Sequence, residues 1–362
     1  MPDCVNPQSL ALRERSDCRM IESRLPEGNA IAMDRLEQLR IWASGQLDVP
    51  AVELVPASED ASFRRYFRVA RGGGTVIVMD APAPHEDCST FVRVAQIFRE
   101  AGANVPEVLA QDLERGFLLV TDLGSTTYLE RIDAANADAL YRDALAALIK
   151  LQQASRPGVL PEYDRPLLQR ELDLFPQWYV RCHLGQSLSA EQQASLERMF
   201  ETLVANNLAQ PRVFVHRDYH SRNLMVADPC PGILDFQDAV YGPVTYDLVS
   251  LLKDAYIEWT EERVLDWTVR FWDGARAAAL PVAADFSEFY RDFEWMGVQR
   301  HLKVLGIFAR LWHRDGKDRY LADLPLVLRY LQRTAERYHE LSPLAVLLDK
   351  LHGRSRRVAH TF

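Results

Sequence analysis

Acidic and amide side chains recur at fixed spacing near the middle of the chain. The segment His216–Asn223 reads HRDYHSRN, and a later apolar run ends in Asp235. An aspartate at the end of a strand can accept a proton from an attacking hydroxyl, and Mg²⁺ prefers hard oxygen ligands. Each residue taken alone is more often a turn former or a cap. Their joint spacing predicts proton transfer by Asp218 and Mg²⁺ binding by Asn223 and Asp235.

The order of these residues is that of a kinase catalytic loop followed by a metal-binding aspartate. The run HRD-x4-N, the turn DPCPG and an apolar strand ending in Asp235 place a base and two metal ligands on adjacent elements. Nucleotide phosphates and water would complete the Mg²⁺ shell. The spacing therefore indicates phosphoryl transfer. The histidine and arginine of HRD are expected to shape the loop, and Asp238 could be a further acidic group of the site or a turn cap.

Strand patterns dominate the N-terminal part of the chain. A helix is expected from Asp34, after which VELV, FRRYFRVA and TVIVMDA read as strands. RGGG at 71–74 is predicted to be a hairpin turn and not a phosphate loop, because alternation flanks it and no helix follows. A helix over 87–101 and the strands VPEVLAQD and GFLLVTDLG complete a small antiparallel lobe, which we assign to residues 34–124.

Helical patterns dominate residues 125–350. Ser189 with Gln192 three positions later forms a capping-box pattern, and short strands interrupt the helices only around the HRD run. Residues 1–33 are expected to be a poorly ordered leader and 351–362 a tail. The predicted fold class is α+β and bilobal, with a small antiparallel-sheet N-lobe carrying one main helix and a larger, mostly helical C-lobe.

The run HRDYHSRNLMV followed by GILDFQDAVYGPVTYDL resembles the aminoglycoside phosphotransferase and choline kinase superfamily, over roughly residues 34–340. The resemblance implies a protein-kinase-like fold, with ATP in the small lobe and the acceptor in the helical lobe. It also implies that Asp218 is the catalytic base and that Asn223 and Asp235 are the Mg²⁺ ligands. The cofactors are therefore expected to be ATP and Mg²⁺.

The small lobe departs from the family pattern at two places. PASEDASFRRYFRV has no glycine where a Gly-rich loop would lie, so the Ser62 hydroxyl and nearby backbone N–H groups are expected to cradle phosphate. Met79 stands where the family carries lysine, and no lysine precedes Lys150. The positive charge that neutralises the nucleotide phosphates then comes either from an arginine (Arg64, Arg65 or Arg68) or from Mg²⁺ alone. The alternative for these arginines is that they are solvated positions of an alternating strand. The candidate nucleotide-binding residues are Ser62, Phe63, Arg64, Arg65, Thr121 and Leu123, the last two through linker backbone that would contact adenine.

The connection after Asp235 and the overall charge limit the class of acceptor. Only about ten residues separate Asp235 from the helix near Tyr246, too few for a peptide-binding activation segment, and Asp247 is expected to cap that helix. A net charge of −9 argues against nucleic acid and anionic membranes. No run has the length of a membrane span, and five scattered cysteines fit a reducing cytoplasm. We predict a cytoplasmic protein with a small-molecule partner; no protein partner is indicated.

Longer stretches narrow the resemblance further. ASFRRYFRV, the lysine-free VIVMDAPAP, LLVTDLG and QRHLKVLGIFARLWHRDGK resemble the anomeric kinases that phosphorylate N-acetylmuramate and N-acetylglucosamine at C1 in peptidoglycan recycling. An acceptor carboxylate would require arginine or lysine, and aromatic side chains could stack on a sugar. For the charged side chains of the terminal helical region the alternative is a solvated helix face. The candidate acceptor residues are Trp178, His220, Arg222, Arg300 and Lys303, with Tyr179, His301 and Arg310 as further possibilities.

Two alternatives stay open. A kinase for an amino alcohol or an aminoglycoside would have acidic residues lining its acceptor pocket, because its substrate is a cation. A nucleotide-binding pseudokinase would explain the missing lysine, although the intact Asp218, Asn223 and Asp235 argue against it.

Overall fold

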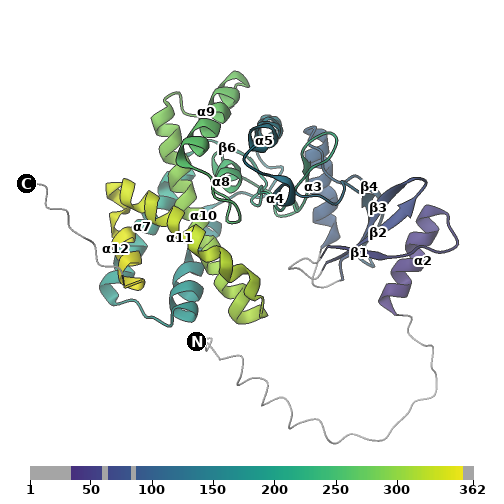
Figure 1. The fold of residues 1–362 in the computed structure, drawn as a ribbon, viewed down its shortest axis with the longest axis horizontal. Coiled ribbons are helices and arrows are strands. Elements are labelled where there is room, and N and C mark those ends of the chain that lie inside the picture. Colours follow the sequence, from purple (N-terminus) through teal and green to yellow (C-terminus); the bar gives the residue numbers. More distant parts are fainter. Residues whose placement is uncertain (1–33, 59–63, 83–86, 354–362) are drawn as a thin grey trace, which may run out of the picture.

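A five-stranded antiparallel sheet and a larger group of helices form two lobes (Figure 1). The computed structural model describes residues 34–58, 64–82 and 87–353. The expected leader, the tail from residue 354, and Ser62 and Phe63 lie outside the described residues. The α+β fold class predicted from the sequence is confirmed.

The N-lobe sheet has the strand order β1-β2-β3-β5-β4. The β2–β3 pair runs in register from Arg65 opposite Asp80 to Arg71 opposite Gly74, and Gly72 and Gly73 have positive φ values of 51° and 89°. These left-handed residues form the tight turn, so the predicted hairpin is confirmed. The VELV prediction placed the first strand too early. The strands are β1 (Val55–Ser58), β2 (Arg65–Arg71), β3 (Gly74–Asp80), β4 (Val108–Asp112) and β5 (Phe117–Thr121).

The two faces of this sheet are covered by different helices. Helix α2 (Arg35–Leu47) packs through Leu39 and Trp42 against one face, to which Phe67 and Val78 belong. Helix α3 (Cys88–Glu100) packs against the other face, which continues into the core of the C-lobe. Strand alternation therefore decides whether a side chain faces α2 or faces α3 and the C-lobe.

The C-lobe is built around one long helix, α10 (Phe286–Asp315), which packs against α6, η1, α8 and α11. Its buried residues lie on all sides, as expected of a central helix. The predicted capping box of Ser189 and Gln192 is present at the start of α7. The other helices are α4 (Tyr128–Arg131), α5 (Ala137–Gln153), α6 (Arg165–Leu174), the π-helix η1 (Phe175–His183), α7 (Ala190–Ala209), α8 (Tyr246–Leu252), α9 (Glu261–Ala277), the 3-10 helix η2 (Asp318–Asp323), α11 (Leu324–Arg337), the 3-10 turn η3 (His339–Leu341) and α12 (Ser342–Leu351).

Two small ladders interrupt the helices. Strand β6 (Arg212–Val215) pairs with β9 (Val240–Pro243), and β7 (Leu224–Met225) pairs with β8 (Gly232–Ile233). The sequence indicated β6, β7 and β8 but not β9, because VYGP carries glycine and proline, which are unfavourable in strands. The β6–β7 and β8–β9 connections carry the HRD run and Asp235.

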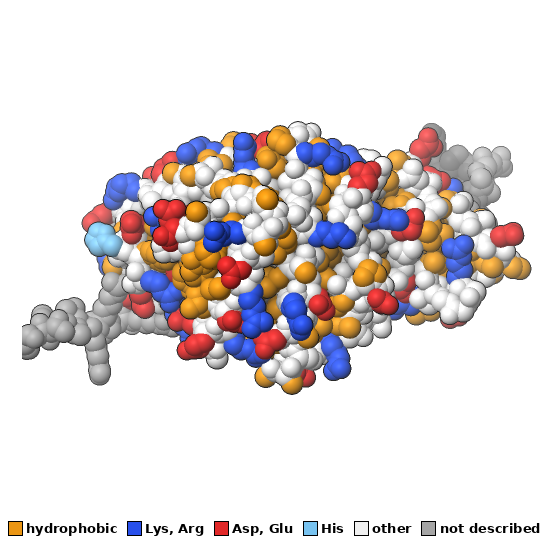
Figure 2. Space-filling view, turned by 90° about the horizontal axis from the view of Figure 1, so that it is seen from above, with side chains coloured by type: hydrophobic (Ala, Val, Ile, Leu, Met, Phe, Trp, Pro, Cys, Tyr) orange, Lys and Arg blue, Asp and Glu red, His pale blue; other side chains and the backbone are white. Residues whose placement is uncertain are grey.

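The surface carries charges of both signs. Figure 2 shows lysine and arginine side chains interspersed with aspartate and glutamate on the face drawn there, together with scattered hydrophobic side chains. Among the described helices, none is long and apolar enough to cross a membrane.

Candidate active site

The loop that follows β6 places Asp218 beside a neutral, buried histidine. His216 accepts a hydrogen bond from the Asp218 N–H at Nδ1 (3.3 Å), so its Nε2 donates to the Leu234 carbonyl (2.9 Å). Burial lowers the pKa of His216 to about 4. The ring therefore joins the Asp218 loop to the strand end that precedes Asp235, in agreement with a loop-shaping role.

The side chains of Asn223 and Asp235 converge at the ends of the paired strands β7 and β8. Asn223 Nδ2 donates to the Asp218 carbonyl (2.9 Å) and lies 3.4 Å from Asp235 Oδ2, and Leu234 N–H donates to the Asn223 carbonyl (2.9 Å). These contacts use the amide nitrogen of Asn223, so its side-chain oxygen is the atom suited to a cation. The structure therefore brings Asp218, Asn223 and Asp235 together.

Two non-glycine residues of the site have left-handed backbone conformations. The φ values are 80° at Arg217 and 62° at Asp235. Each such residue costs on the order of 1–3 kcal/mol and persists only where its surroundings hold it. Strained backbone at both places shows that the surrounding contacts hold this loop and hairpin in place.

Asp247 holds the strained backbone and does not cap a helix. Its carboxylate accepts the N–H groups of His216 (2.6 Å) and Arg217 (2.9 Å), while the N-cap position of α8 is Thr245. Burial raises the pKa of Asp247 to about 7. The capping prediction was wrong because a sequence shows that Asp247 opens a helix but not that a distant loop lies against it.

A buried cluster of charges lies beneath the catalytic loop. Glu171 of α6 accepts hydrogen bonds from Arg217 Nη2 (2.5 Å) and the Tyr163 hydroxyl, and Lys303 Nζ lies 3.2 Å from its carboxylate. Lys303 Nζ also donates to the Tyr246 hydroxyl (3.0 Å). Glu171 is a residue that sequence reasoning missed, since a single glutamate in an amphipathic helix gives no signal.

Arg300 of α10 connects this cluster to Asp218. Its Nη1 donates to the Arg217 carbonyl (3.0 Å) and lies 3.4 Å from Asp218 Oδ1. Burial alone would raise the pKa of Asp218, but the positive charges of Lys303 and Arg300 outweigh it and lower the pKa below its usual value. Asp218 is therefore a carboxylate at neutral pH, ready to accept a proton.

The candidate acceptor residues fall into different environments. Lys303 is already paired with Glu171, and His301 is buried on another face of α10, stacked on Tyr330 and bonded to the Lys253 carbonyl. His220 follows Asp218 closely, and its ring contacts Tyr256 edge-on. Arg222 lies over the Tyr256 ring, 3.7 Å from its centroid. Trp178 is half-buried on η1 against the core, and none of the site contacts given above involves it.

The arginines of the N-lobe point to two different places. Arg65 faces the α2 side, where its Nε donates to the fully buried Asp80 (3.0 Å) together with Arg35 of α2 (2.9 Å). Arg68 faces the other side, where its Nε donates to Asp122 in the linker between the lobes (2.5 Å). Arg64 lies directly before β2 and is half-buried. Asp80 and Asp122 are thus acid partners that sequence reasoning missed.

Met79 and the linker lie on the C-lobe side of the sheet. Met79 is fully buried in the core cluster that includes Phe91 and Phe98 of α3. Those two rings pack on Phe236, which follows Asp235, with centroids 4.8 and 5.9 Å away. Helix α3 is thereby linked by aromatic contacts to the segment that carries Asp235.

The lobes also meet through Gly232 in β8. A Cβ atom at this glycine would lie 3.1 Å from Leu123 Cδ1 of the linker, so the linker side chain packs closely against the hairpin here. On the other side of the hairpin, Ile233 N–H donates to the Asn104 carbonyl of the N-lobe (2.7 Å). The predicted adenine-contacting backbone at Thr121 and Leu123 therefore lies directly beside the strand that leads to Asp235.

The oxygen atoms at the hairpin suit a magnesium ion that also binds nucleotide. Asp235 and Asn223 offer one carboxylate and one amide oxygen, and Gln237 Nε2 orients Asp235 through a 2.7 Å hydrogen bond. The buried Gln237 Oε1 has no partner in the described part of the chain. The described residues contain no cluster of three or more histidine, cysteine or acidic side chains suited to a metal. A hard cation with most of its shell from phosphate and water fits this small donor set.

Comparison with known proteins identifies related sequences over most of the chain. The model of the phosphotransferase enzyme family matches residues 53–286. A Pseudomonas aeruginosa protein named N-acetylmuramate/N-acetylglucosamine kinase is 52% identical over 88% of this chain and 97% of that protein. Proteins of the same name from Neisseria meningitidis and Caulobacter vibrioides are 50% and 32% identical, over 89% and 75% of this chain and 97% and 85% of those proteins.

Solved structures with the same fold are more distant in sequence. A choline/ethanolamine kinase family protein from Mesorhizobium loti superposes with a TM-score of 0.57 at 14% identity, covering 88% of this chain and all of that one. Spectinomycin phosphotransferase in complex with ADP and spectinomycin gives a TM-score of 0.54 at 11% identity, covering 87% of this chain and 98% of that one. These similarities confirm the predicted bilobal, protein-kinase-like fold.

Proposed function

Because the chain belongs to the phosphotransferase enzyme family, which uses ATP, we propose that it phosphorylates the C1 hydroxyl of N-acetylmuramate and N-acetylglucosamine. The names of relatives about half identical over nearly their whole length support the choice of sugars. The structural observation that carries the proposal is Asp218, kept as a carboxylate by the positive charges of Lys303 and Arg300 and close to Asn223, whose side chain lies beside Asp235. The names of these relatives support amino sugars and not the cationic amino alcohol or aminoglycoside of the alternative hypothesis.

Asp218 is the proton acceptor in the proposed reaction. Its carboxylate takes the proton of the C1 hydroxyl while that oxygen bonds to the γ-phosphorus of ATP and the bond to the β-phosphate oxygen breaks, which releases ADP. An anomeric hydroxyl is more acidic than an ordinary alcohol, so Asp218 can work with a low pKa. Most of the rate then comes from positioning and electrostatic stabilisation.

Asn223 and Asp235 are the proposed Mg²⁺ ligands. When bound there, the ion would neutralise phosphate charge during transfer. The Asn223 side-chain amide is fixed by the Asp218 carbonyl, and Gln237 fixes Asp235. The proposed base is thus tied to one ligand within its own loop, and the other ligand is oriented within the β8–β9 connection.

Nucleotide binding is proposed to use the linker backbone at Thr121 and Leu123 and the N–H groups near Arg64, which precedes β2. Phosphate contacts from Ser62 and Phe63 remain predictions. The proposed phosphate role of Arg65 has less support, because that side chain is held by Asp80 on the α2 side of the sheet.

The decisive experiment is a panel of acceptors with Mg-ATP, read by phosphorus and proton NMR. We expect a new sugar phosphate at C1 with N-acetylmuramate and with N-acetylglucosamine, and little product with choline or an aminoglycoside. The Asp218→Asn variant is the matched control for contaminating kinases. Absence of product with every amino sugar would refute the proposed function, and product at another hydroxyl would refute the C1 assignment.

A further inference from the structure

The residues that follow Asp218 in its loop have two kinds of neighbour. Asn223 lies beside Asp235, at the hairpin that adjoins the N-lobe. His220, whose N–H donates to the Asp218 carbonyl (3.0 Å), and Arg222 both contact Tyr256. The second group rests on C-lobe aromatic side chains, so it faces the part of the molecule where the acceptor is expected.

Arg222 is held in place by aromatic rings and not by an acid. Its guanidinium carbon lies 3.7 Å from the centroid of Tyr256, on the α8–α9 connection, and 5.8 Å from that of Tyr320 in η2. Within residues 34–58, 64–82 and 87–353, Arg222 forms no hydrogen bond or ion pair. Asp323 is near enough for the charge of Arg222 to oppose the rise that burial causes in its pKa. Stacking fixes the plane of the guanidinium while its N–H donors stay available.

The preceding residue of the loop, Ser221, already has hydrogen-bond partners and cannot turn toward a ligand as Arg222 can. Ser221 points inward and donates from both N–H (3.0 Å) and Oγ (2.5 Å) to the buried Asp254. Tyr256 N–H donates to the other oxygen of Asp254 (3.1 Å). Asp254 therefore joins the catalytic loop to the α8–α9 connection and sets the stack of Arg222 on Tyr256.

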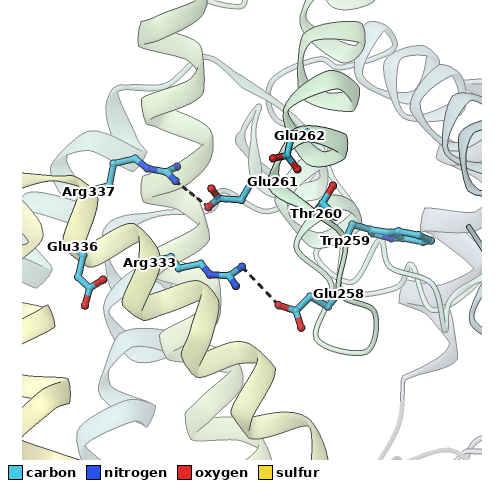
Figure 3. A pocket seen from close by; sticks show the side chains of 8 residues that line it. All are labelled: Glu258, Trp259, Thr260, Glu261, Glu262, Arg333, Glu336 and Arg337. Atoms are coloured by element: carbon cyan, nitrogen blue, oxygen red, sulfur yellow. Dashed lines mark hydrogen bonds and ion pairs between the residues drawn. The ribbon is translucent and has the colours of Figure 1, made fainter. Parts of the chain in front are cut away.

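Several other arginines of the C-lobe are paired with acids. A hollow of about 630 Å³ between the α8–α9 connection and α11 shows this (Figure 3). There Arg333 lies 3.6 Å from Glu258, and Arg337 lies 2.9 Å from Glu261. Arg300 and Lys303 are likewise paired, with Asp218 and Glu171. Arg222, by contrast, forms no ion pair within the described residues, although Asp323 lies near it, so its N–H donors can bind an anionic group of the acceptor.

We propose that Arg222 binds the lactyl carboxylate of N-acetylmuramate and thereby favours this sugar over N-acetylglucosamine. The inference rests on the proposed function. The two sugars differ by the lactyl ether at C3, two ring positions from the reacting C1, and Arg222 follows Asp218 by four residues in a tight loop. A planar guanidinium can bind both oxygens of a carboxylate, and Arg222 is a specificity residue, not part of the proton transfer.

The test compares the two sugars within each variant. We expect Arg222→Gln to lower the ratio of kcat/KM for N-acetylmuramate to that for N-acetylglucosamine by at least about tenfold, the usual effect of losing a charge-assisted bidentate contact. Arg222→Lys keeps the positive charge but lacks the paired N–H donors of the guanidinium. Its ratio of kcat/KM for the two sugars should therefore be intermediate. Arg276→Gln is the matched control, because Arg276 also lies over an aromatic ring, 4.6 Å from the centroid of Trp272.

A change in the ligand makes the test independent of how the variant folds. The neutral methyl ester of N-acetylmuramate should be a poorer substrate than the acid for the unmodified protein, and Arg222→Gln should abolish this preference. An unchanged sugar ratio in Arg222→Gln, or a persisting preference for the acid, would overturn the proposal. So would a drop in the ratio caused by Arg310→Gln instead, since Arg310 on α10 also has a buried Nε without a partner in the described part of the chain.

The failure of this inference can be told apart from failure of the proposed function. If the unmodified protein transfers phosphate to neither sugar, the proposed function is wrong. If it phosphorylates both sugars and Arg222→Gln slows both equally, the function stands and the carboxylate contact is refuted.

Discussion

The two lobes use their positive charges differently. In the N-lobe, Arg65 and Arg68 lie on opposite faces of one strand and bind separate acids, Asp80 and Asp122. In the C-lobe, Arg300 and Lys303 converge on a single loop, where they lower the pKa of Asp218. These N-lobe charges therefore hold elements together, whereas Arg300 and Lys303 keep the proposed proton acceptor ionised.

The same contrast holds for the link between the lobes. The family places a lysine in the N-lobe strand where this chain has Met79, which is fully buried among apolar side chains. Helix α3 reaches the metal-site segment through Phe91 and Phe98 on Phe236, at centroid distances of 4.8 and 5.9 Å. Apolar packing thus joins α3 of the N-lobe to the segment of the C-lobe that follows Asp235.

We expect the largest loss of activity from a change at Asp218, on which the charges of Arg300 and Lys303 converge. Asp218→Asn removes the proton acceptor, and we expect kcat to fall by about 10²–10⁴-fold. Nucleotide affinity, measured by calorimetry with Mg-ADP, should change little because Asn223 and Asp235 are kept. Unchanged turnover would remove Asp218 from the mechanism, and lost nucleotide binding would show that the loop had collapsed.

A loss of stability is expected from a change at Glu171, the acid of the buried charge cluster beneath the Asp218 loop. Glu171→Gln leaves Arg217 and Lys303 without a charged partner, so the free energy of unfolding should fall by about 3–5 kcal/mol. Urea denaturation followed by circular dichroism measures it. The matched control is Glu201→Gln, which breaks the exposed 2.6 Å ion pair with Arg165 and should cost at most about 1 kcal/mol. Equal losses in the two variants would contradict the contrast between buried and exposed charge.

Acid should weaken the same loop through His216. Its pKa is about 4 in the folded protein against an ordinary value of 6.5, so the unfolded chain takes up the proton first. This contribution to stability is complete above pH 6.5 and is lost as the pH falls toward 4, for a total of about 3 kcal/mol. We expect the free energies of unfolding of the wild type and of His216→Gln, measured from pH 7 to pH 4, to approach each other as the pH falls. Asp247, whose pKa is raised, acts in the opposite direction in both proteins. Parallel curves would mean that His216 is not held neutral.

Local patterns in the sequence predicted the elements of both lobes. Alternation and the Gly72–Gly73 pair predicted the hairpin, and Ser189 with Gln192 predicted the start of α7. The order Asp218, Asn223, Asp235 predicted a site whose three side chains the structure brings together. The hairpin and the start of α7 are confirmed because each depends on residues close in sequence, and the fixed spacing of the motif predicted the proximity of the three side chains, whose roles remain predictions.

The sequence did not predict contacts between residues that are far apart along the chain. Asp247 reaches back to residues 216 and 217, and Glu171 meets Lys303 from helices that pack only in the tertiary fold. The N-lobe showed the same limit: alternation placed Arg65 and Arg68 on opposite faces, but nothing local identified Asp80 and Asp122 as their partners. A buried ionisable residue in a helix or strand has no sequence signature of its own.

We expect the smallest change from a substitution of Arg65, whose charge has a structural role in the N-lobe. Arg65→Gln removes one of two arginines from Asp80, and the remaining Arg35 stays 2.9 Å from that carboxylate. Because the Arg65 side chain is about half exposed, the free energy of unfolding should fall by about 1 kcal/mol or less. The KM for ATP should not change, since Arg65 faces α2 and not the C-lobe. Asp80→Asn, which weakens both pairs at once, gives the upper limit for the stability loss. A large rise in the KM for ATP in Arg65→Gln would instead make Arg65 the replacement for the missing lysine, and the division between structural charge in the N-lobe and catalytic charge in the C-lobe would fail.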